Sequence, residues 1–244
     1  FGTEYGEFTG THMYVDPAGG GQNGDETGYA VTRFLGNKVY LVAVGGVPGG
    51  LEASDLEELT RVAVKWKPNK ISIERNYGNG ALQKVWEPTL YKAMKEVNAG
   101  VEIDDPWETG QKELRIIDKL EPVIGSGRLV VELDLIQDDW ASVQKYSAVN
   151  RASYSFFHQL AKVTRDRGSL SHDDRLDAVA GSVGNWIDLL AVDDLQAQVA
   201  AEAQRYRTMM EDPLGNGRPI NNYNSMFGLN TLSPNVLNNL KQRY

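Results

Sequence analysis

The order of strand and helix patterns along this chain limits the folds that it can adopt. Residues 12–15 read as a short strand, and residues 28–34 and 38–45 read as a hairpin joined by "LGNK". Its Gly-Asn pair supplies the positive φ angles that a tight turn needs. Beyond this meander, strands alternate with helices. The order predicts an α/β domain with a mixed sheet and helices on its faces.

The remaining strand and helix patterns extend this sheet as far as about residue 190, and the composition changes after it. Helices are expected at 51–66, 78–97 and 109–127, a buried strand at 69–74, and further strands at 100–105 and 128–133. Pro88 marks a potential break in the second helix. From residue 191 the chain reads as a polar, Ala-rich helix, and residues 213–244 are rich in Asn, Gly and Pro. We therefore expect a core domain at 1–190 and a helix with a flexible tail or docking segment at 191–244.

Composition narrows the classes of function. The 244 residues carry a formal net charge of −8, which taken alone argues against a nucleic-acid partner. A site for divalent cations, however, adds carboxylates to this count, and the bound ions reverse the local field. The absence of Cys excludes disulfides and thiolate metal sites, and the three scattered His residues argue against a zinc site.

The sequence shows no targeting or membrane signal. No apolar run approaches the roughly 18 residues of a membrane span, and the N-terminus lacks a signal-peptide pattern. We therefore expect a soluble, intracellular protein. Its first residue is Phe1 rather than Met, which indicates a piece of a longer chain or a processed product.

Two acids stand where predicted strands end. Asp16 closes the first strand before the Gly-rich turn "PAGGGQNGDETG", and Glu74 closes "KISIE" before "RNYGNG". In a sheet that contains parallel strands, such ends converge on one edge, where ligands bind in open α/β sheets. For Asp16 taken alone, a simple Asp-Pro turn explains the residue equally well.

A third group of acids opens a helix in "SLSHDDRLDAVAGSV". Ser171 and Asp174 form a capping-box-like pair, and the helix dipole favours acids in a first turn. Capping does not explain Asp177, which lies one turn further along, where like charges repel. A helical wheel places Asp174 on a line of small residues that permits close packing, and Asp173 nearest the apolar stripe. The spacing leaves open which of these three acids is functional.

These acids indicate a chemistry. Carboxylates from two strand ends and one helix start suit hard cations such as Mg²⁺ and Mn²⁺. Two ions about 3.5 to 4 Å apart would bridge a phosphodiester, one activating water and the other neutralising the leaving oxygen. The predicted reaction class is metal-assisted phosphodiester hydrolysis.

The same features resemble a known family. An Asp at the end of strand one, a hairpin, the Glu of "SIERNYGNG" and a late "HDDRLDAVAG" resemble the RNase H-like nuclease domain of tailed-phage large terminases. The run "FFHQLAKVTRDRGSLSHDDRLDAVAG" is most similar to terminases of short-tailed podoviruses. The resemblance covers about residues 10–190 and extends to the tail. It implies an Mg²⁺- or Mn²⁺-dependent endonuclease, with two ions when DNA is bound, that cuts double-stranded viral DNA concatemers during genome packaging in the host cytoplasm.

The resemblance also implies roles for individual residues. It assigns the catalytic, metal-binding triad to Asp16, Glu74 and Asp174. "DRLDAVA" is also similar to the last motif of Holliday-junction resolvases, in which both acids of a D-x-x-D pair serve, so Asp177 is an auxiliary metal ligand. Asp25 matches an accessory acid of several terminases and is a weaker metal candidate. Asp173 also remains a weaker candidate, because the helical wheel does not exclude it.

Basic residues beside these acids are candidates for DNA contact. They are Arg75, Lys162, Arg165, Arg167 and Arg175. An alternative of equal weight is that they only neutralise neighbouring carboxylates. Contacts to the DNA backbone would position a duplex without reading its sequence, so we expect cutting with little sequence specificity.

Terminases of this type also contain an N-terminal ATPase motor. This chain has no G-x-x-x-x-G-K-[ST] motif, so it resembles the nuclease part alone and contains no ATP site. The implied partners are double-stranded DNA, the missing ATPase domain, the portal and the small terminase subunit, and no membrane is involved.

Three alternatives remain at this point. A phosphotransferase of the actin and sugar-kinase class shares the core fold, but it normally needs a second copy of the strand pattern, which this sequence lacks. A nuclease similar to Holliday-junction resolvases is a second alternative. The third is a module that mainly docks on the portal through its tail. Deletion of residues 213–244 should leave cleavage intact if the tail only docks.

Overall fold

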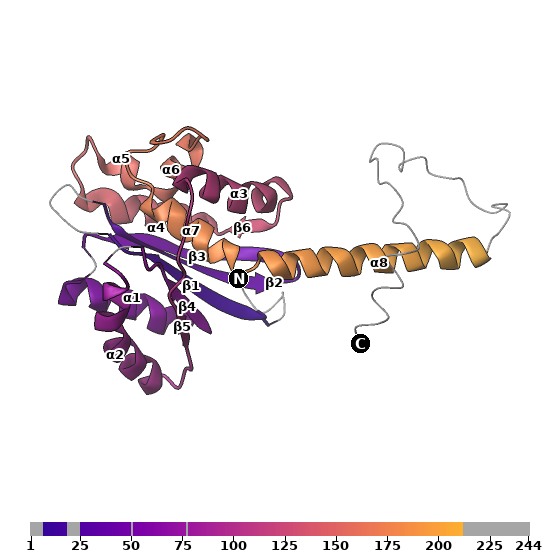
Figure 1. The fold of residues 1–244 in the computed structure, drawn as a ribbon, viewed down its shortest axis with the longest axis horizontal. Helices are drawn as coiled ribbons and strands as arrows, with labels where there is room; N and C mark the ends of the chain where they lie inside the picture. Colours follow the sequence, from indigo (N-terminus) through magenta and orange to yellow (C-terminus); the bar gives the residue numbers. More distant parts are fainter. Residues whose placement is uncertain (1–6, 19–24, 50, 77, 212–244) are drawn as a thin grey trace. The chain divides into compact units, whose positions relative to one another are not determined.

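The computed structural model describes residues 7–18, 25–49, 51–76 and 78–211, and its main element is a mixed sheet (Figure 1). The strands are β1 (Gly10–Asp16), β2 (Thr27–Leu35), β3 (Lys38–Val47), β4 (Lys70–Ile73), β5 (Glu102–Asp104) and β6 (Leu129–Val131). The six strands lie in the order β5-β4-β1-β2-β3-β6. The β1–β2 and β2–β3 pairs are antiparallel, and the other neighbours are parallel.

The hairpin turn forms as its residues predict. Gly36 and Asn37 join β2 to β3 with φ angles of 57° and 62°. Both angles lie in the left-handed region, which Gly and Asn tolerate better than other residues. The hairpin places β2 at the centre of the meander, paired with β1 on one side and β3 on the other, and the β2–β3 register shifts between Val31 and Thr32.

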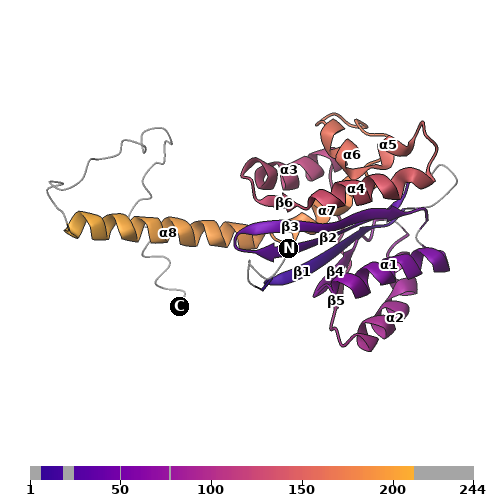
Figure 2. The same cartoon turned by 180° about the vertical axis from the view of Figure 1, so that it is seen from behind.

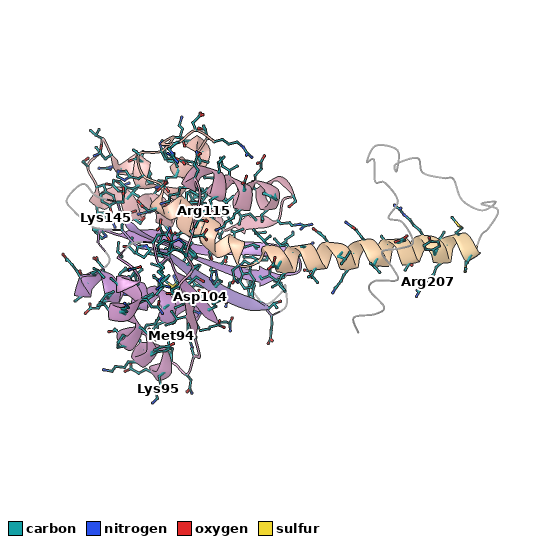
Figure 3. The ribbon with its side chains drawn as sticks, viewed as in Figure 1. Met94, Lys95, Asp104, Arg115, Lys145 and Arg207 are labelled. Carbon is teal, nitrogen blue, oxygen red and sulfur yellow. The ribbon has the colours of Figure 1, made fainter. Side chains whose placement is uncertain are left out.

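Helices cover both faces of the sheet (Figures 1 and 2). In the part of the chain that the structure describes, the helices are α1 (Ala53–Trp66), α2 (Ala81–Glu96), α3 (Lys112–Gly125), α4 (Leu133–Ser142), α5 (Arg151–Tyr154), α6 (Phe156–Lys162), α7 (Asp174–Gly184) and α8 (Ile187–Glu211). The apolar sides of α1 and α2 pack on one face, whereas α3, α4, α6 and α7 pack on the other. Met94 of α2 and Arg115 of α3 accordingly lie on opposite sides of the sheet in Figure 3.

Side chains of β1 point alternately into the two hydrophobic cores, one on each face of the sheet. Met13 and Val15 pack with α1 and α2, and Tyr14 points to the opposite core, as the two-residue period of a strand requires. Pro88 does not break α2, which runs through it from Ala81 to Glu96. The buried face of α2, which includes Trp86 and Leu90, holds the helix together because this packing outweighs the hydrogen bond that proline removes.

The most closely packed helix is α7. A Cβ atom at Gly181 would lie 2.6 Å from the ring of Tyr14 on β1, and one at Gly28 of β2 would collide with the backbone of Asp174. The predicted line of small residues therefore lets α7 approach the sheet closely. Every residue from Asp174 to Val183 is buried.

The connection from β6 to α7 contains helices that were not predicted. Helices α4, α5 and α6 and a 3-10 turn at Val143–Lys145 occupy this region. The chain divides into two compact units, residues 1–194 and 195–244, and α8 includes the boundary. The predicted tail at 213–244 lies outside the described residues. Among the described helices, none has both the length and the apolar character that a membrane crossing requires.

Candidate metal centre

The parallel pairing of β1 and β4 brings two of the predicted acids together. Val15 pairs with Ile73, and the backbone N–H of Glu74 donates to the carbonyl oxygen of Val15 at 2.9 Å. Asp16 and Glu74, the next residues on each strand, therefore lie side by side at the carboxyl ends of neighbouring strands. This is the convergence that the sequence predicted.

The first turn of α7 adds a third carboxylate to this edge, and it comes from Asp177. One oxygen each of Asp16, Glu74 and Asp177 lie within 4.8 Å of one another. The three residues are 8%, 5% and 3% exposed. The structure thus gathers three buried carboxylates from two strand ends and one helix. We refer to Asp16, Glu74 and Asp177 as the acidic triad.

Two cations from the start of α3 contact the acidic triad. Lys112 Nζ lies 3.1 Å from Oδ2 of Asp16, 3.3 Å from Oδ2 of Asp177 and 2.9 Å from Oδ1 of Asp173. Arg115 Nη2 lies 2.8 Å from Oδ2 of Asp177 and 3.9 Å from Oε2 of Glu74. The buried negative charge is therefore partly balanced by groups about one hundred residues away in sequence from Asp16.

Burial and mutual repulsion shift the titration of these groups. Burial raises the pKa of Asp16 well above its ordinary value; Lys112 opposes this shift, and the charge of Asp177 adds to it. Burial and Asp177 likewise raise the pKa of Glu74, against the opposing charge of Arg115. Burial lowers the pKa of Lys112, but Asp16, Asp177 and Asp173 outweigh this effect, so the net shift is upward. The triad binds protons or cations more readily than separate surface acids would.

Asp174 belongs to a second group, with Asp25 and His172. Ligand atoms of these three residues also lie within 4.8 Å of one another, and His172 Nδ1 is 3.1 Å from Oδ1 of Asp25. The Glu26 N–H donates to Oδ2 of Asp174 at 3.2 Å. Burial raises the pKa of Asp174 to about 7, with further contributions from Asp25 and Asp173 and opposition from Lys112.

Stacked rings support the histidine of this second group. The ring of His172 lies on Tyr154 with centroids 3.9 Å apart, and Tyr154 stacks on Tyr146 at the same separation. The phenol of Tyr146 donates to Oε1 of Glu26 at 2.5 Å. This stack fixes the plane of the His172 imidazole beside Asp25.

The acids at the start of α7 therefore have three different positions. Asp177 lies in the triad, Asp174 lies with Asp25, and Asp173 is the N-cap residue, close to Lys112. Ser171 does not cap the helix as predicted, because α7 begins three residues later and no side-chain cap bond forms. Asp174 and Asp177 are about 60° apart around the helix axis, enough to direct them to different neighbours.

The sequence reasoning missed Lys112, Arg115, Tyr14 and His172. Lys112 and Arg115 are three residues apart at the start of α3, and this spacing places two cations on one side of a helix. Tyr14 donates to Oε2 of Glu74 at 3.3 Å and lies two residues before Asp16 on the same strand. His172 adjoins Asp173 in the quoted motif. The spacing of Lys112 and Arg115 could have shown that they share one side of a helix. It could not have shown that this side faces the acidic triad.

The basic candidates for DNA contact differ in exposure. Lys162 and Arg167 are exposed. Arg75 is half exposed and lies 3.5 Å from Asp105. Arg165 is 59% exposed and lies 2.8 Å from Glu121. These residues are accessible to a ligand.

Arg175 departs from the expected role. Its side chain is 0% exposed, and it forms ion pairs with Glu26 and Asp139 inside the protein. A fully buried guanidinium cannot reach DNA in this structure. The alternative, that the residue neutralises neighbouring carboxylates, describes Arg175 correctly.

The donor set of the triad fits a magnesium or manganese ion. Carboxylate oxygens are the ligands that these ions prefer, and the three side chains converge within reach of one ion. Burial, with a further contribution from the charge of Asp177, raises the pKa values of Asp16 and Glu74, so a cation bound between these carboxylates would stabilise their charged forms. The second group offers two further carboxylates and one imidazole nitrogen.

Comparisons with known proteins identify relatives of this chain. Residues 15–129 match the family model of the ribonuclease H-like domain of the bacteriophage T7 terminase. Over 213 residues, the chain is 34% identical to the terminase large subunit of Enterobacteria phage T3. This alignment covers 86% of the chain and 34% of the phage T3 protein, so the chain spans about a third of that relative's length.

Solved structures support the fold. The chain is similar to a human cytomegalovirus terminase nuclease domain soaked with manganese and bound to an inhibitor, with a TM-score of 0.54 and 15% identity over 78% of this chain and 89% of that one. A second manganese-soaked structure of that domain gives a TM-score of 0.51 at 14% identity, covering 79% of this chain and 91% of that one. The predicted RNase H-like mixed sheet, flanked by helices, is confirmed.

Proposed function

Residues 15–129 belong to the family of RNase H-like domains of the bacteriophage T7 terminase, and from this premise we propose that the chain is the nuclease part of a phage large terminase. In this proposal it is a metal-dependent endonuclease that cuts double-stranded viral DNA concatemers during genome packaging in the host cytoplasm. The observation that carries the proposal is the acidic triad, three buried carboxylates at the carboxyl ends of β1 and β4 and the start of α7.

Two ions would be held by the two groups of acids. Asp16, Glu74 and Asp177 would hold one ion, and Asp174 with Asp25 would hold the second when DNA is bound. The chemistry that magnesium or manganese supplies when bound is activation of a water molecule and neutralisation of the leaving oxygen in phosphodiester hydrolysis. Asp173 has a supporting role, because it holds the ammonium group of Lys112.

The chain's own residues orient these ligands. Arg115 donates to Asp177 at 2.8 Å and thereby fixes the carboxylate against α3. Tyr14 donates to Glu74 from the neighbouring strand. Such partners of the ligands keep the oxygens in place and exclude other rotamers. The rigid sheet edge and the closely packed α7 provide the frame on which the reaction geometry depends.

DNA would be held through its backbone. The exposed residues Lys162, Arg165 and Arg167 precede α7 in sequence, and Arg75 follows Glu74 directly. Contacts to phosphates position a duplex without reading bases, so cleavage should show little sequence specificity. A terminase ATPase domain, the portal and the small terminase subunit would be the protein partners, and cleavage itself would not need ATP.

The deciding experiment incubates the chain with plasmid DNA and Mg²⁺ or Mn²⁺, with and without EDTA. Parallel reactions contain Asp16→Ala, Glu74→Ala, Asp174→Ala and Asp177→Ala. We expect metal-dependent cutting by the parent and none by the folded Asp16 and Glu74 variants. Normal cutting by both of those variants would refute the proposed site. Nucleotide binding without cleavage would favour the phosphotransferase alternative.

A further inference from the structure

Arg175 lies between Asp174 and Asp177 in sequence, and its side chain is fully buried. Its Nε and Nη2 atoms donate to the two oxygens of Glu26, at 2.7 and 3.1 Å. Its Nη1 donates to Oδ1 of Asp139 at 2.8 Å and to Oγ of Ser142 at 2.7 Å. The planar guanidinium is thereby shared among three anchors, a geometry that the compact ammonium of lysine cannot reproduce.

The Glu26 pair connects the two elements that carry the second group of acids. Glu26 follows Asp25 and directly precedes β2, and Arg175 follows Asp174 at the start of α7. The backbone N–H of Glu26 also donates to Oδ2 of Asp174 at 3.2 Å. The Glu26–Arg175 pair therefore holds Asp25 and Asp174 close together, although their like charges repel.

Asp139, the second acidic partner of Arg175, is itself held in place by hydrogen bonds. It accepts a hydrogen bond from Oγ of Ser155 at 2.6 Å and one from the Phe156 N–H at 3.2 Å, so it connects α4 to the start of α6. Glu26 and Asp139 are each 1% exposed. Separation of Arg175 from either partner would leave an uncompensated charge in the interior, which costs much free energy. The network therefore strongly restricts movement of the first turn of α7.

We propose that Arg175 is a positioning residue for the metal centre. By locking the first turn of α7 to β2 and α4, it directs Asp177 to the acidic triad and Asp174 to the group with Asp25. It touches neither DNA nor the reacting atoms. The inference rests on the proposed function only in that Asp174 and Asp177 are metal ligands. It explains why Arg175, which adjoins Asp174 in sequence, is fully buried.

The test is Arg175→Lys, which keeps the charge and loses the forked geometry. The probe is Mn²⁺ alone, with binding followed by electron paramagnetic resonance of the free ion and by thermal shift. We expect manganese affinity to fall about tenfold to 100-fold, the range for residues that orient metal ligands. In cleavage assays kcat should fall while KM for plasmid DNA stays unchanged, because Arg175 does not contact DNA.

Two controls separate positioning from general damage. Arg128→Lys alters another forked pair, in which Arg128 contacts both oxygens of Asp194 away from the acids, and should keep the parent's manganese affinity. Leu59→Ala removes a fully buried side chain on α1, across the sheet, and should lower stability without changing manganese affinity. A loss of affinity in Leu59→Ala equal to that in Arg175→Lys would overturn the inference.

Glu26→Gln changes the other partner of the Arg175–Glu26 pair. It tests the positioning role of Arg175 if Arg175→Lys does not fold. It removes the charge of the partner and keeps its shape, so we expect weaker manganese binding here too. Parent-like manganese affinity in either folded variant would overturn the inference. If the parent binds manganese but cuts no DNA, the proposed function fails, whereas the binding measurements still judge the role of Arg175.

Discussion

The ammonium group of Lys112 lies 3.1 Å from a carboxylate oxygen of Asp16, and it also contacts Asp177 and Asp173. A divalent cation that enters the triad must compete with this ammonium for the same oxygens. We therefore predict that Lys112→Met binds Mn²⁺ about tenfold more tightly, a change of roughly 1.4 kcal/mol. The metal-free variant should melt at a lower temperature, because the acids lose their balancing charge.

Titration calorimetry with Mn²⁺ checks this prediction. The matched control is Lys119→Met on the same helix, since Lys119 pairs with Glu108 at 2.8 Å and not with the triad. Equal manganese affinity in the parent and in Lys112→Met would show that the lysine does not compete with the ion.

Asp177 and Asp174 should differ in their effect on cleavage. Asp177 shares the triad with Asp16 and Glu74, so we predict that Asp177→Asn lowers the cleavage rate by at least about 100-fold, more than the loss of most supporting residues. Asp174→Asn should lower it less. Initial rates of plasmid nicking in Mn²⁺ measure both. Inactive Asp174→Asn beside active Asp177→Asn would restore the assignment made from the sequence.

The buried acids of the metal centre should lower the stability of the metal-free protein as the pH rises from about 4 to 7, and this effect should exceed the opposite one of His12, whose pKa burial lowers to about 4. The folded protein holds a proton on Asp174 up to a pKa of about 7, whereas the unfolded chain releases it near 3.8. The folded state binds more protons in this window, so unfolding becomes easier as the pH rises through it. Asp16 and Glu74 act in the same direction.

Urea titrations in EDTA across this pH range measure the effect. Asp174→Asn should make stability less dependent on pH, whereas Asp188→Asn, which changes an exposed acid of α8, should leave the dependence unchanged. A parent whose stability rises between pH 4 and 7 would contradict the prediction.

Metal binding should stabilise the fold. At an ion concentration 100 times the dissociation constant, binding to the native state adds about 2.7 kcal/mol to the free energy of unfolding. We expect Mg²⁺ or Mn²⁺ to raise the melting temperature of the parent, and EDTA to reverse the rise. Asp16→Asn should lose most of this response. A melting curve that ignores millimolar metal would contradict a preformed site.

The exposed basic residues before α7 should contribute to DNA affinity through charge alone. For Lys162→Ala or Arg167→Ala, we predict weaker binding to all sequences and a slope of log affinity against log salt reduced by about one. Lys92→Ala is the control, because Lys92 is exposed on α2, on the other side of the sheet. Fluorescence anisotropy with duplex DNA in Ca²⁺ at several salt concentrations measures the slope. Equal slopes for all variants would exclude this surface.

Local patterns in the sequence determined the secondary structure near the site. The turn at Gly36 and Asn37 and the strand ends at Asp16 and Glu74 depend on neighbouring residues, so the sequence predicted them directly. The convergence of Asp16 and Glu74 also followed, because parallel strands bring their carboxyl ends to one edge. The helices between β6 and α7 were not predicted, since their short segments lack a clear period.

Tertiary structure decided the partners of the charged residues. Asp174 and Asp177 are both buried acids on one helix, and only the positions of α3 and β2 send them to different groups. Lys112 reaches Asp16 across 96 residues of sequence, a contact that no local spacing encodes. Arg175 resembles a surface cation in sequence, but Glu26 and Asp139 hold it in the interior. Electrostatic interactions depend on distance in space, so the sequence determined which charges are present and the fold determined which of them meet.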